Sequence, residues 1–333
     1  MSIRYKDTEY TYISAKVRAM ENSLVGRDCL ERMISAEDTE SAASYLREYG
    51  LDLVGLSAAD REAVLTEALG EGIAAIERNA PSPELFAFFR YPYDCSNIKS
   101  LIKCKIRGID PEPLLFSVGS VPKKELAEAF SKNDFSPLPE NMAKAAQKAS
   151  QAYAETKNPQ LIDFILDKAC FDDIEACAQK SGIAYIKDIT SARADLTNFM
   201  ICLRILRMNC GTYADDLLEQ ALIDCGRIGK KRFTKEFSKG EEGLISALFG
   251  AGYRSLSAKL SPGCSLERAE KLCDNARTEL VCRAKRVTFG VEIPLAYIAA
   301  LETEIQNIRI VLAGKDAGSS PDIISERIRE CYV

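Results

Sequence analysis

One helical pattern recurs three times along the chain, and this repetition constrains the fold more than any other feature. In each copy an acidic residue is followed by Asn three positions later, and apolar residues lie one, four and five positions beyond that Asn. The asparagines are Asn97, Asn198 and Asn307, which are 101 and 109 residues apart. A pattern that returns at a nearly constant period is typical of related structural units. We therefore expect three similar helical units.

A second similarity has almost the same period. Residues 115–132 and 222–239 are identical at seven of 18 positions without gaps, and this alignment pairs Gly119 with Gly226. A weaker match places Gly318 at the corresponding point of the third unit. Chance similarity between amphipathic helices is the alternative explanation. Two separate motifs recur in the same order, however, which favours related units.

Helical periodicity dominates the chain, whereas the alternating Val-rich stretches typical of strands are scarce. Capping-box patterns predict that helices begin after Ser35 and after Ser57. The last long helix is expected at about 295–313, where apolar residues at steps of three and four form a seam that needs a partner helix. Residues 289–294 are a possible strand or extended linker. The fold class that we predict is all-α.

The overall composition is that of an ordinary globular protein. The 333 residues are 47% hydrophobic and 28% charged, and they are enough for two or three domains. The net charge of −5 does not favour a nucleic-acid partner. No apolar run reaches the roughly 18 to 20 residues that span a bilayer, and the N-terminal sequence contains no hydrophobic signal segment. We therefore expect a protein of the cytosol without a direct membrane span.

The chain lacks the side chains that most often carry out catalysis near neutral pH. It contains no His, which removes the usual general base and the commonest metal ligand. Its twelve Cys include no C-x-x-C pair and are expected to be reduced, and two thiols on one helix face, Cys170 and Cys177, do not make a zinc site. We therefore expect no catalytic residue, no cofactor and no metal.

Two other motifs resemble chemical sites but fit a surface role better. Residues 226–231 combine glycines with two lysines, but a P-loop needs four residues between its glycines and a Ser or Thr after the Lys. Adjacent acidic pairs could serve acid–base or metal chemistry, but neighbouring side chains point to different faces of a helix. We expect these pairs to be solvated; they are Asp172 with Asp173, Asp215 with Asp216, and Glu241 with Glu242.

The repeated asparagines need a shared explanation, because Asn is mildly unfavourable inside a helix. A buried amide must have hydrogen-bond partners. We therefore expect each of these amides to bond to the end of a neighbouring helix within its own unit. Direct contact with a partner protein is the alternative.

The segments 93–99 and 304–310, the loops at Gly119 and Gly226, and the pair Gly314-Lys315 together resemble one protein family. It is the C subunit of V/A-type ATPases, which is related to the d subunit of eukaryotic V-ATPases. The resemblance extends over nearly the whole chain, in length as well as in motif order. None of these motifs is a catalytic signature, so the resemblance depends on their combination.

The resemblance implies a funnel-shaped protein of three similar helical domains with pseudo-threefold symmetry. The first lobe would comprise residues 1–90 with 295–333, closed by the N- and C-terminal helices, and the other two would be 91–190 and 191–294. The protein would be a non-catalytic central-stalk subunit that links rotor shaft subunits of the D and F type to the membrane proteolipid ring. It would transmit torque during ATP-driven ion transport or ATP synthesis, on the cytoplasmic face of the cell membrane.

Four lysines follow the two repeated glycines at matched positions, and they are Lys123, Lys124, Lys230 and Lys231. They either face a symmetric partner such as the ring or belong to two solvated helix starts, and the sequence leaves both readings open. For the whole chain, an all-helical scaffold or adaptor unrelated to ATPases is the alternative function. An enzyme would need a pocket with convergent polar groups, for which the sequence offers no candidate.

Overall fold

The computed structural model describes residues 6–208, 211 and 213–333. Within these ranges every regular element is a helix and no strand occurs, so the prediction of an all-α protein is confirmed. The chain divides into two compact units. The middle unit covers Leu85–Leu266, and the terminal unit combines Arg4–Glu84 with Glu267–Val333.

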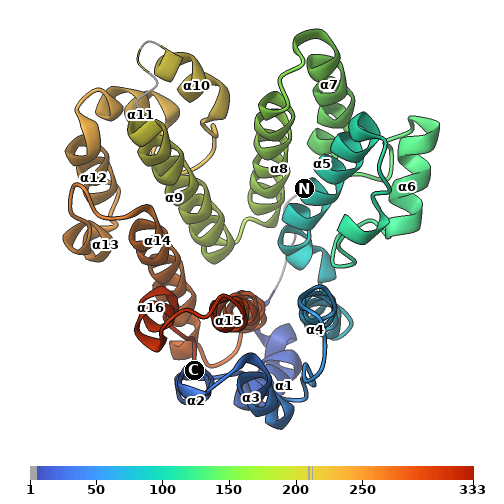
Figure 1. The fold of residues 1–333 in the computed structure, drawn as a ribbon, viewed down its shortest axis with the longest axis vertical. Helices are drawn as coiled ribbons and strands as arrows, with labels where there is room; N and C mark the ends of the chain where they lie inside the picture. The colour runs from blue at the N-terminus through green and yellow to red at the C-terminus, as the bar shows by residue number, and fades with distance from the viewer. Residues whose placement is uncertain (1–5, 209–210, 212) are drawn as a thin grey trace. The chain divides into compact units, whose positions relative to one another are not determined.

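The terminal unit is built by both ends of the chain around one long helix (Figure 1). That helix, α15 (Glu292–Asp316), packs against α1, α2, α3 and α4 and is buried along most of its length. Its apolar seam therefore finds several partner helices. The other α-helices of this unit are α1 (Thr11–Met20), α2 (Arg27–Ser35), α3 (Thr39–Ser44), α4 (Ala58–Glu77), α14 (Leu266–Val281) and α16 (Pro321–Arg327).

The middle unit is organised around α8 (Gln160–Ser181), which contacts α5, α7, α9 and α10 (Figure 1). The helix begins after Pro159 and ends at Gly182, whose φ of 71° suits a glycine. The other α-helices here are α5 (Tyr91–Arg107), α6 (Lys123–Lys132), α7 (Glu140–Thr156), α9 (Ala184–Met208), α10 (Tyr213–Ala221), α11 (Lys230–Phe237), α12 (Gly240–Gly250) and α13 (Arg254–Lys259).

Short 3₁₀ segments extend or connect these helices. They include one that follows α14 directly and one that precedes the first asparagine helix. The segments are η1 (Asp7–Tyr10), η2 (Glu21–Ser23), η3 (Tyr45–Tyr49), η4 (Pro83–Phe89), η5 (Glu112–Leu114) and η6 (Cys282–Arg286).

Two local predictions are wrong. Residues 289–294 form neither a strand nor an extended linker, because α15 already begins at Glu292. The capping residue near position 35 is Asp38 rather than Ser35, since the Asp38 carboxylate accepts a hydrogen bond of 2.7 Å from the N–H of Ser41. An ionised Asp is a stronger acceptor than a hydroxyl at this position. The predicted cap Ser57 is confirmed, because its side chain accepts from the N–H of Asp60.

None of the described helices is long and apolar enough to cross a membrane. The cysteines in the described ranges form no disulfide, and many of them are buried. Burial in apolar surroundings raises the pKa of the Cys202 thiol to about 12, so this side chain behaves as a small hydrophobic residue.

Candidate functional site

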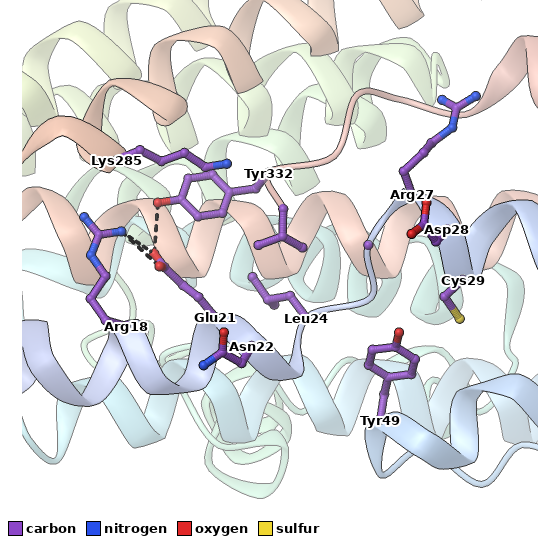
Figure 2. A pocket seen from close by; sticks show the side chains of 12 residues that line it. Arg18, Glu21, Asn22, Leu24, Arg27, Asp28, Cys29, Tyr49, Lys285 and Tyr332 are labelled. Atoms are coloured by element: carbon purple, nitrogen blue, oxygen red, sulfur yellow. Dashed lines mark hydrogen bonds and ion pairs between the residues drawn. The ribbon is translucent and has the colours of Figure 1, made fainter.

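The terminal unit contains a pocket of about 670 Å³, a size that could hold a small molecule (Figure 2). Its main charged groups bind one another: Arg18 lies 2.9 Å from both carboxylate oxygens of Glu21, and it also donates to the carbonyl of Ala284. The hydroxyl of Tyr332 donates to the same Glu21 carboxylate at 2.9 Å. The pocket thus stabilises the terminal unit internally, and its polar groups do not converge on an empty centre as those of a catalytic site would.

The first repeated asparagine forms a buried clamp in the middle unit. Asn97 lies on α5 and is fully buried. Its Nδ2 donates to the carbonyl of Phe116 at 2.9 Å, and its Oδ1 accepts from the N–H of Phe116 at 2.7 Å. One side chain therefore satisfies both backbone groups of a residue 19 positions away. We call this pair of bonds an amide clamp.

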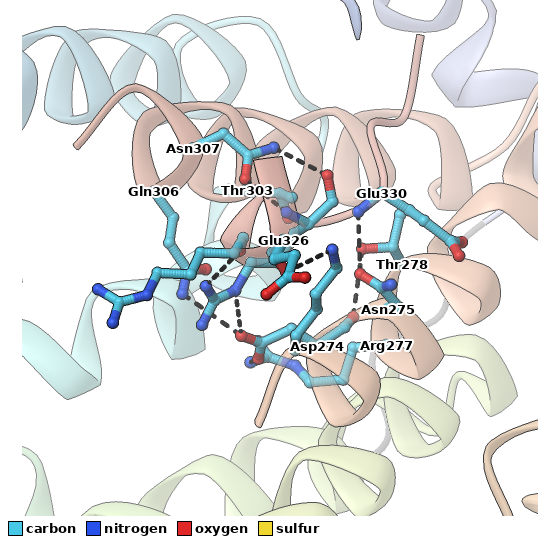
Figure 3. Close-up of polar contacts among 12 residues, drawn as sticks. Asp274, Asn275, Arg277, Thr278, Thr303, Gln306, Asn307, Glu326 and Glu330 are labelled. Carbon is cyan, nitrogen blue, oxygen red and sulfur yellow. Dashed lines mark hydrogen bonds and ion pairs between the residues drawn. The ribbon is translucent and has the colours of Figure 1, made fainter. Parts of the chain in front are cut away.

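The same clamp occurs at the other two asparagines, which are also fully buried. Asn198 on α9 makes both bonds to Ile223, each 2.9 Å long. Asn307 on α15 makes them to Arg329, at 3.2 Å from Nδ2 to the carbonyl and 2.9 Å from the N–H to Oδ1 (Figure 3). Each partner residue lies two positions beyond a short helix, so the amide does not bond to the helix end itself.

The acidic residue of the pattern holds the loop that follows the clamp. Asp94 accepts bonds from the Ser120 hydroxyl at 2.6 Å and from the N–H of Val121 at 3.3 Å. Asp195 accepts from the N–H groups of Arg227 and Ile228 and from the hydroxyl of Tyr253. Burial raises the pKa of both carboxyl groups, and these hydrogen bonds oppose that rise.

The two repeated glycines are required because the loop backbone lies directly against these carboxylates. A Cβ atom added at Gly119 would collide with Oδ1 of Asp94, and one added at Gly226 would collide with Oδ1 of Asp195. Gly226 also has a φ of +117°, which an L side chain rarely adopts. The repeated Asp, Asn and Gly are therefore parts of one structural device.

The third repeat departs from this arrangement. Glu304 replaces the aspartate; its Oε2 atom is buried without a hydrogen-bond partner, and burial raises its pKa to about 7 against a bond from the backbone of Val25. The match to Gly318 is wrong, because Gly318 belongs to the turn that ends α15. The position three residues beyond the clamped Arg329 is occupied by Tyr332 instead.

Polar contacts with α14 replace the missing glycine loop in this repeat (Figure 3). The guanidinium Nε of Arg329 lies 3.0 Å from the Asp274 carboxylate. The N–H of Glu330 donates to the side chain of Asn275 at 2.9 Å. The segment after α16 is therefore fixed both by the amide clamp on α15 and by two side chains of α14.

The four matched lysines occupy the first two positions of α6 and α11. Lys123 and Lys230 are half-buried, whereas Lys124 and Lys231 are exposed, so the two pairs have matching environments. The Nζ of Lys230 donates to the carbonyl of Glu219 at 2.8 Å. Cations are disfavoured near a helix N-terminus by the helix dipole, so neither pair stabilises the helix that it begins.

One of the acidic pairs was assigned wrongly. Asp173 is buried rather than solvated, because its carboxylate caps the N-terminus of α7. It accepts bonds of 2.9 Å from the N–H groups of Asn141 and Met142. No local pattern could have revealed this role, since donors and acceptor are more than 30 residues apart. Its neighbour Asp172 is exposed, as expected.

The other two acidic pairs do not form a metal centre either. Asp215 and Asp216 are exposed at the start of α10, and Glu241 forms an ion pair with Arg207 at 3.0 Å. Across the described residues no three Cys, Asp or Glu side chains are placed to hold a metal ion.

Comparison with known proteins identifies the family. The model of the ATP synthase (C/AC39) subunit family matches residues 13–327. The chain belongs to this family. The C subunit of the V-type sodium ATPase of Enterococcus hirae is 24% identical over 97% of this chain and 99% of its own length. The C subunits of the A-type ATP synthases of Methanocaldococcus jannaschii (21% identical; 95% of this chain, 85% of its own) and Methanosphaera stadtmanae (24%; 96% and 87%) are similar over comparable lengths.

Membership of this family confirms the resemblance seen in the sequence. The protein is a non-catalytic component of a rotary V/A-type ATPase. The alternative of an adaptor unrelated to ATPases is therefore wrong. The repeated motif that led to the family holds the fold together and forms no reaction centre.

Proposed function

We propose that this protein is a socket in the central stalk, which links the rotor shaft to the membrane ring of proteolipid subunits. It would pass torque between them during ATP-driven ion transport or ATP synthesis. The partners would be shaft subunits of the D and F type on one side and the ring on the other. Its place would be the cytoplasmic face of the membrane, as a peripheral part of the complex.

The observation that carries this proposal is the threefold recurrence of the amide clamp on α5, α9 and α15. Three similar units suit a partner that presents the same surface repeatedly, as a ring of identical subunits does. Each clamp fully satisfies a buried amide and a backbone residue, and such satisfied networks rigidify a fold. A part that carries torque benefits from stiffness of this kind.

The three lobes belong to the same proposal. Residues 91–190 and 191–294 would each contain one clamp, around Asn97 and Asn198. The third lobe, residues 1–90 with 295–333, would contain the clamp of Asn307. The terminal unit, in which both ends of the chain pack around α15, supports this division.

The lysines at the starts of α6 and α11 are the candidate contacts with the ring. Both helices carry cations where the helix dipole disfavours them, which is more easily explained if an acidic or carbonyl-rich partner faces these positions. Rim charges of this kind mainly set the association rate and its salt dependence. The alternative is that they are solvated, since an exposed ion pair contributes only about 0–1 kcal/mol.

Charge reversal tests these contacts. We expect the change of Lys123, Lys124, Lys230 and Lys231 to Glu to lower retention on membranes stripped of this protein, most strongly at low salt. The control reverses four exposed lysines elsewhere, Lys105, Lys157, Lys180 and Lys259. Helicity measured by circular dichroism must be unchanged in both variants. Wild-type retention of the first variant at every salt concentration removes these lysines from the interface.

Co-purification tests the partners themselves. A tagged copy of the chain should recover both shaft and proteolipid subunits from detergent-solubilised native membranes. Recovery of only stationary subunits of the complex, with neither shaft nor ring, would contradict the proposed position.

A further inference from the structure

Helices α7 and α8 leave an open groove on the middle unit, with a volume of about 380 Å³. Its floor consists of Leu161, Phe164 and Ile165 on α8, and all three side chains remain half-exposed. Their spacing of three and one places them on a single face of the helix. The lining continues along α8 to Asp172, so the groove is about 17 Å long, which is three helical turns.

The edges of this groove are basic. Lys144 and Lys148 from α7 and Lys168 from α8 line it, with Asp172 as the one acidic side chain of the lining. Lys148 is exposed, and Lys144 forms an exposed ion pair with Glu140 at 2.6 Å. An exposed pair of this kind contributes little and is easily exchanged for another partner.

Positive charge is incompletely balanced at one end of the groove. The ammonium groups of Lys168 and Lys230 both donate to a single carbonyl oxygen, that of Glu219, at 3.0 and 2.8 Å. Burial, and then the charge of Lys230, lower the pKa of Lys168, although Asp224 and Asp172 lie nearby. An additional carboxylate at this point would relieve the repulsion between the two cations.

We propose that this groove binds an acidic amphipathic helix of a partner protein in the complex. Apolar residues on one face of that helix would fill the floor, and carboxylates along its two edges would meet Lys144, Lys148 and Lys168. An apolar floor with charged edges is the usual geometry for capturing an amphipathic helix, and the charge of the edges selects the acidic sort. This inference goes beyond the socket role and does not depend on it.

Peptide binding to the full-length protein tests the proposal. The probe is a fluorescein-labelled synthetic helix of about 14 residues, with Leu at positions i, i+3, i+4 and i+7 and Glu along both edges. The matched peptide carries Lys in place of Glu. We expect fluorescence anisotropy to show saturable binding of the acidic peptide, with an affinity that falls as salt rises, and at least roughly tenfold weaker binding of the basic peptide.

Variants locate the binding surface. Lys148→Glu with Lys168→Glu should weaken binding of the acidic peptide by roughly tenfold or more and strengthen binding of the basic peptide. Phe164→Ala should weaken binding of the acidic peptide through loss of the floor. Lys180→Glu, an exposed position at the far end of the same helix, is the matched control and should change nothing. If the double variant fails to fold, the single change Lys148→Gln at an exposed site should still weaken binding.

Several results would overturn the proposal. They are equal binding of both peptides, binding of the acidic peptide that no groove variant changes, and no saturable binding at all. Sedimentation that shows a dimer of the chain lost in Phe164→Ala would assign the groove to a second copy instead. Vesicles containing phosphatidylserine that bind with the same dependence on Lys148 and Lys168, in the absence of peptide binding, would assign it to a lipid surface.

Discussion

Each repeated asparagine satisfies two backbone groups that burial would otherwise leave without partners. We expect Asn198→Ala to lower the free energy of unfolding by about 2–5 kcal/mol, because the buried N–H and carbonyl of Ile223 would each lose a bond worth about 1–3 kcal/mol when left unmade. Urea denaturation measures the change. Asn22→Ala, at an exposed position, should cost less than about 0.5 kcal/mol. Equal effects of the two substitutions would show that the clamp does not stabilise the fold.

The repeated glycines give a second prediction at the same scale. Gly119→Ala and Gly226→Ala should each destabilise the protein by about 1–3 kcal/mol, since the new methyl group would meet a buried carboxylate and Gly226 also has a positive φ. Gly229→Ala is the control, because its added Cβ would meet nothing within 4 Å; it should cost less than about 1 kcal/mol. Thermal unfolding compares the three variants, and an equally large loss at Gly229 would contradict this account.

Glu304 should make stability depend on pH. Its pKa is about 7 in the folded protein, whereas the ordinary pKa of a Glu side chain is 4.5, so the unfolded chain releases this proton first as the pH rises. The free energy of unfolding therefore falls between pH 4.5 and about 8, by up to about 3 kcal/mol from this group. Glu304→Gln cannot lose a proton, so its stability relative to the wild type should increase over the same interval. A constant difference between the two proteins from about pH 5 to 8 would contradict the assignment.

At the scale of elements, Asp173 joins α8 to the start of α7. We expect Asp173→Ala to lower the free energy of unfolding by about 2–3 kcal/mol, because two N–H groups at the α7 terminus would lose a charged acceptor. Hydrogen exchange should become faster in the first turn of α7. Asp172→Ala, the exposed neighbour, should leave both measurements nearly unchanged. Loss of stability without faster exchange in α7 would place the effect elsewhere.

The elements that the sequence predicted best are those whose signals are local. The helix at Lys230–Phe237 and the cap at Ser57 depend only on nearby residues, and both occur as predicted. Residues 289–294 and Ser35 were predicted wrongly, because a neighbouring helix start or a stronger capping residue prevailed. Asp173 could not be found at all, since its partners lie on another helix.

The candidate site shows the same limit. The repeat identified the asparagines, the acidic residues and the two glycines, but not that one glycine loop packs against each aspartate. It also could not reveal that the third repeat uses Arg329 and α14 in place of such a loop. The groove between α7 and α8 was missed because its floor and edges come together only when two helices pack.

At the scale of the whole molecule, threefold repetition and family membership motivate a socket that joins shaft and ring. The most direct test is reconstitution from purified parts: the detergent-solubilised proteolipid ring, the D- and F-type shaft subunits, and this chain. Gel filtration then shows which components elute together. The account predicts that the shaft elutes with the ring only when this chain is present. Elution of shaft and ring together to the same extent without the chain, or binding of the chain to neither, would contradict it.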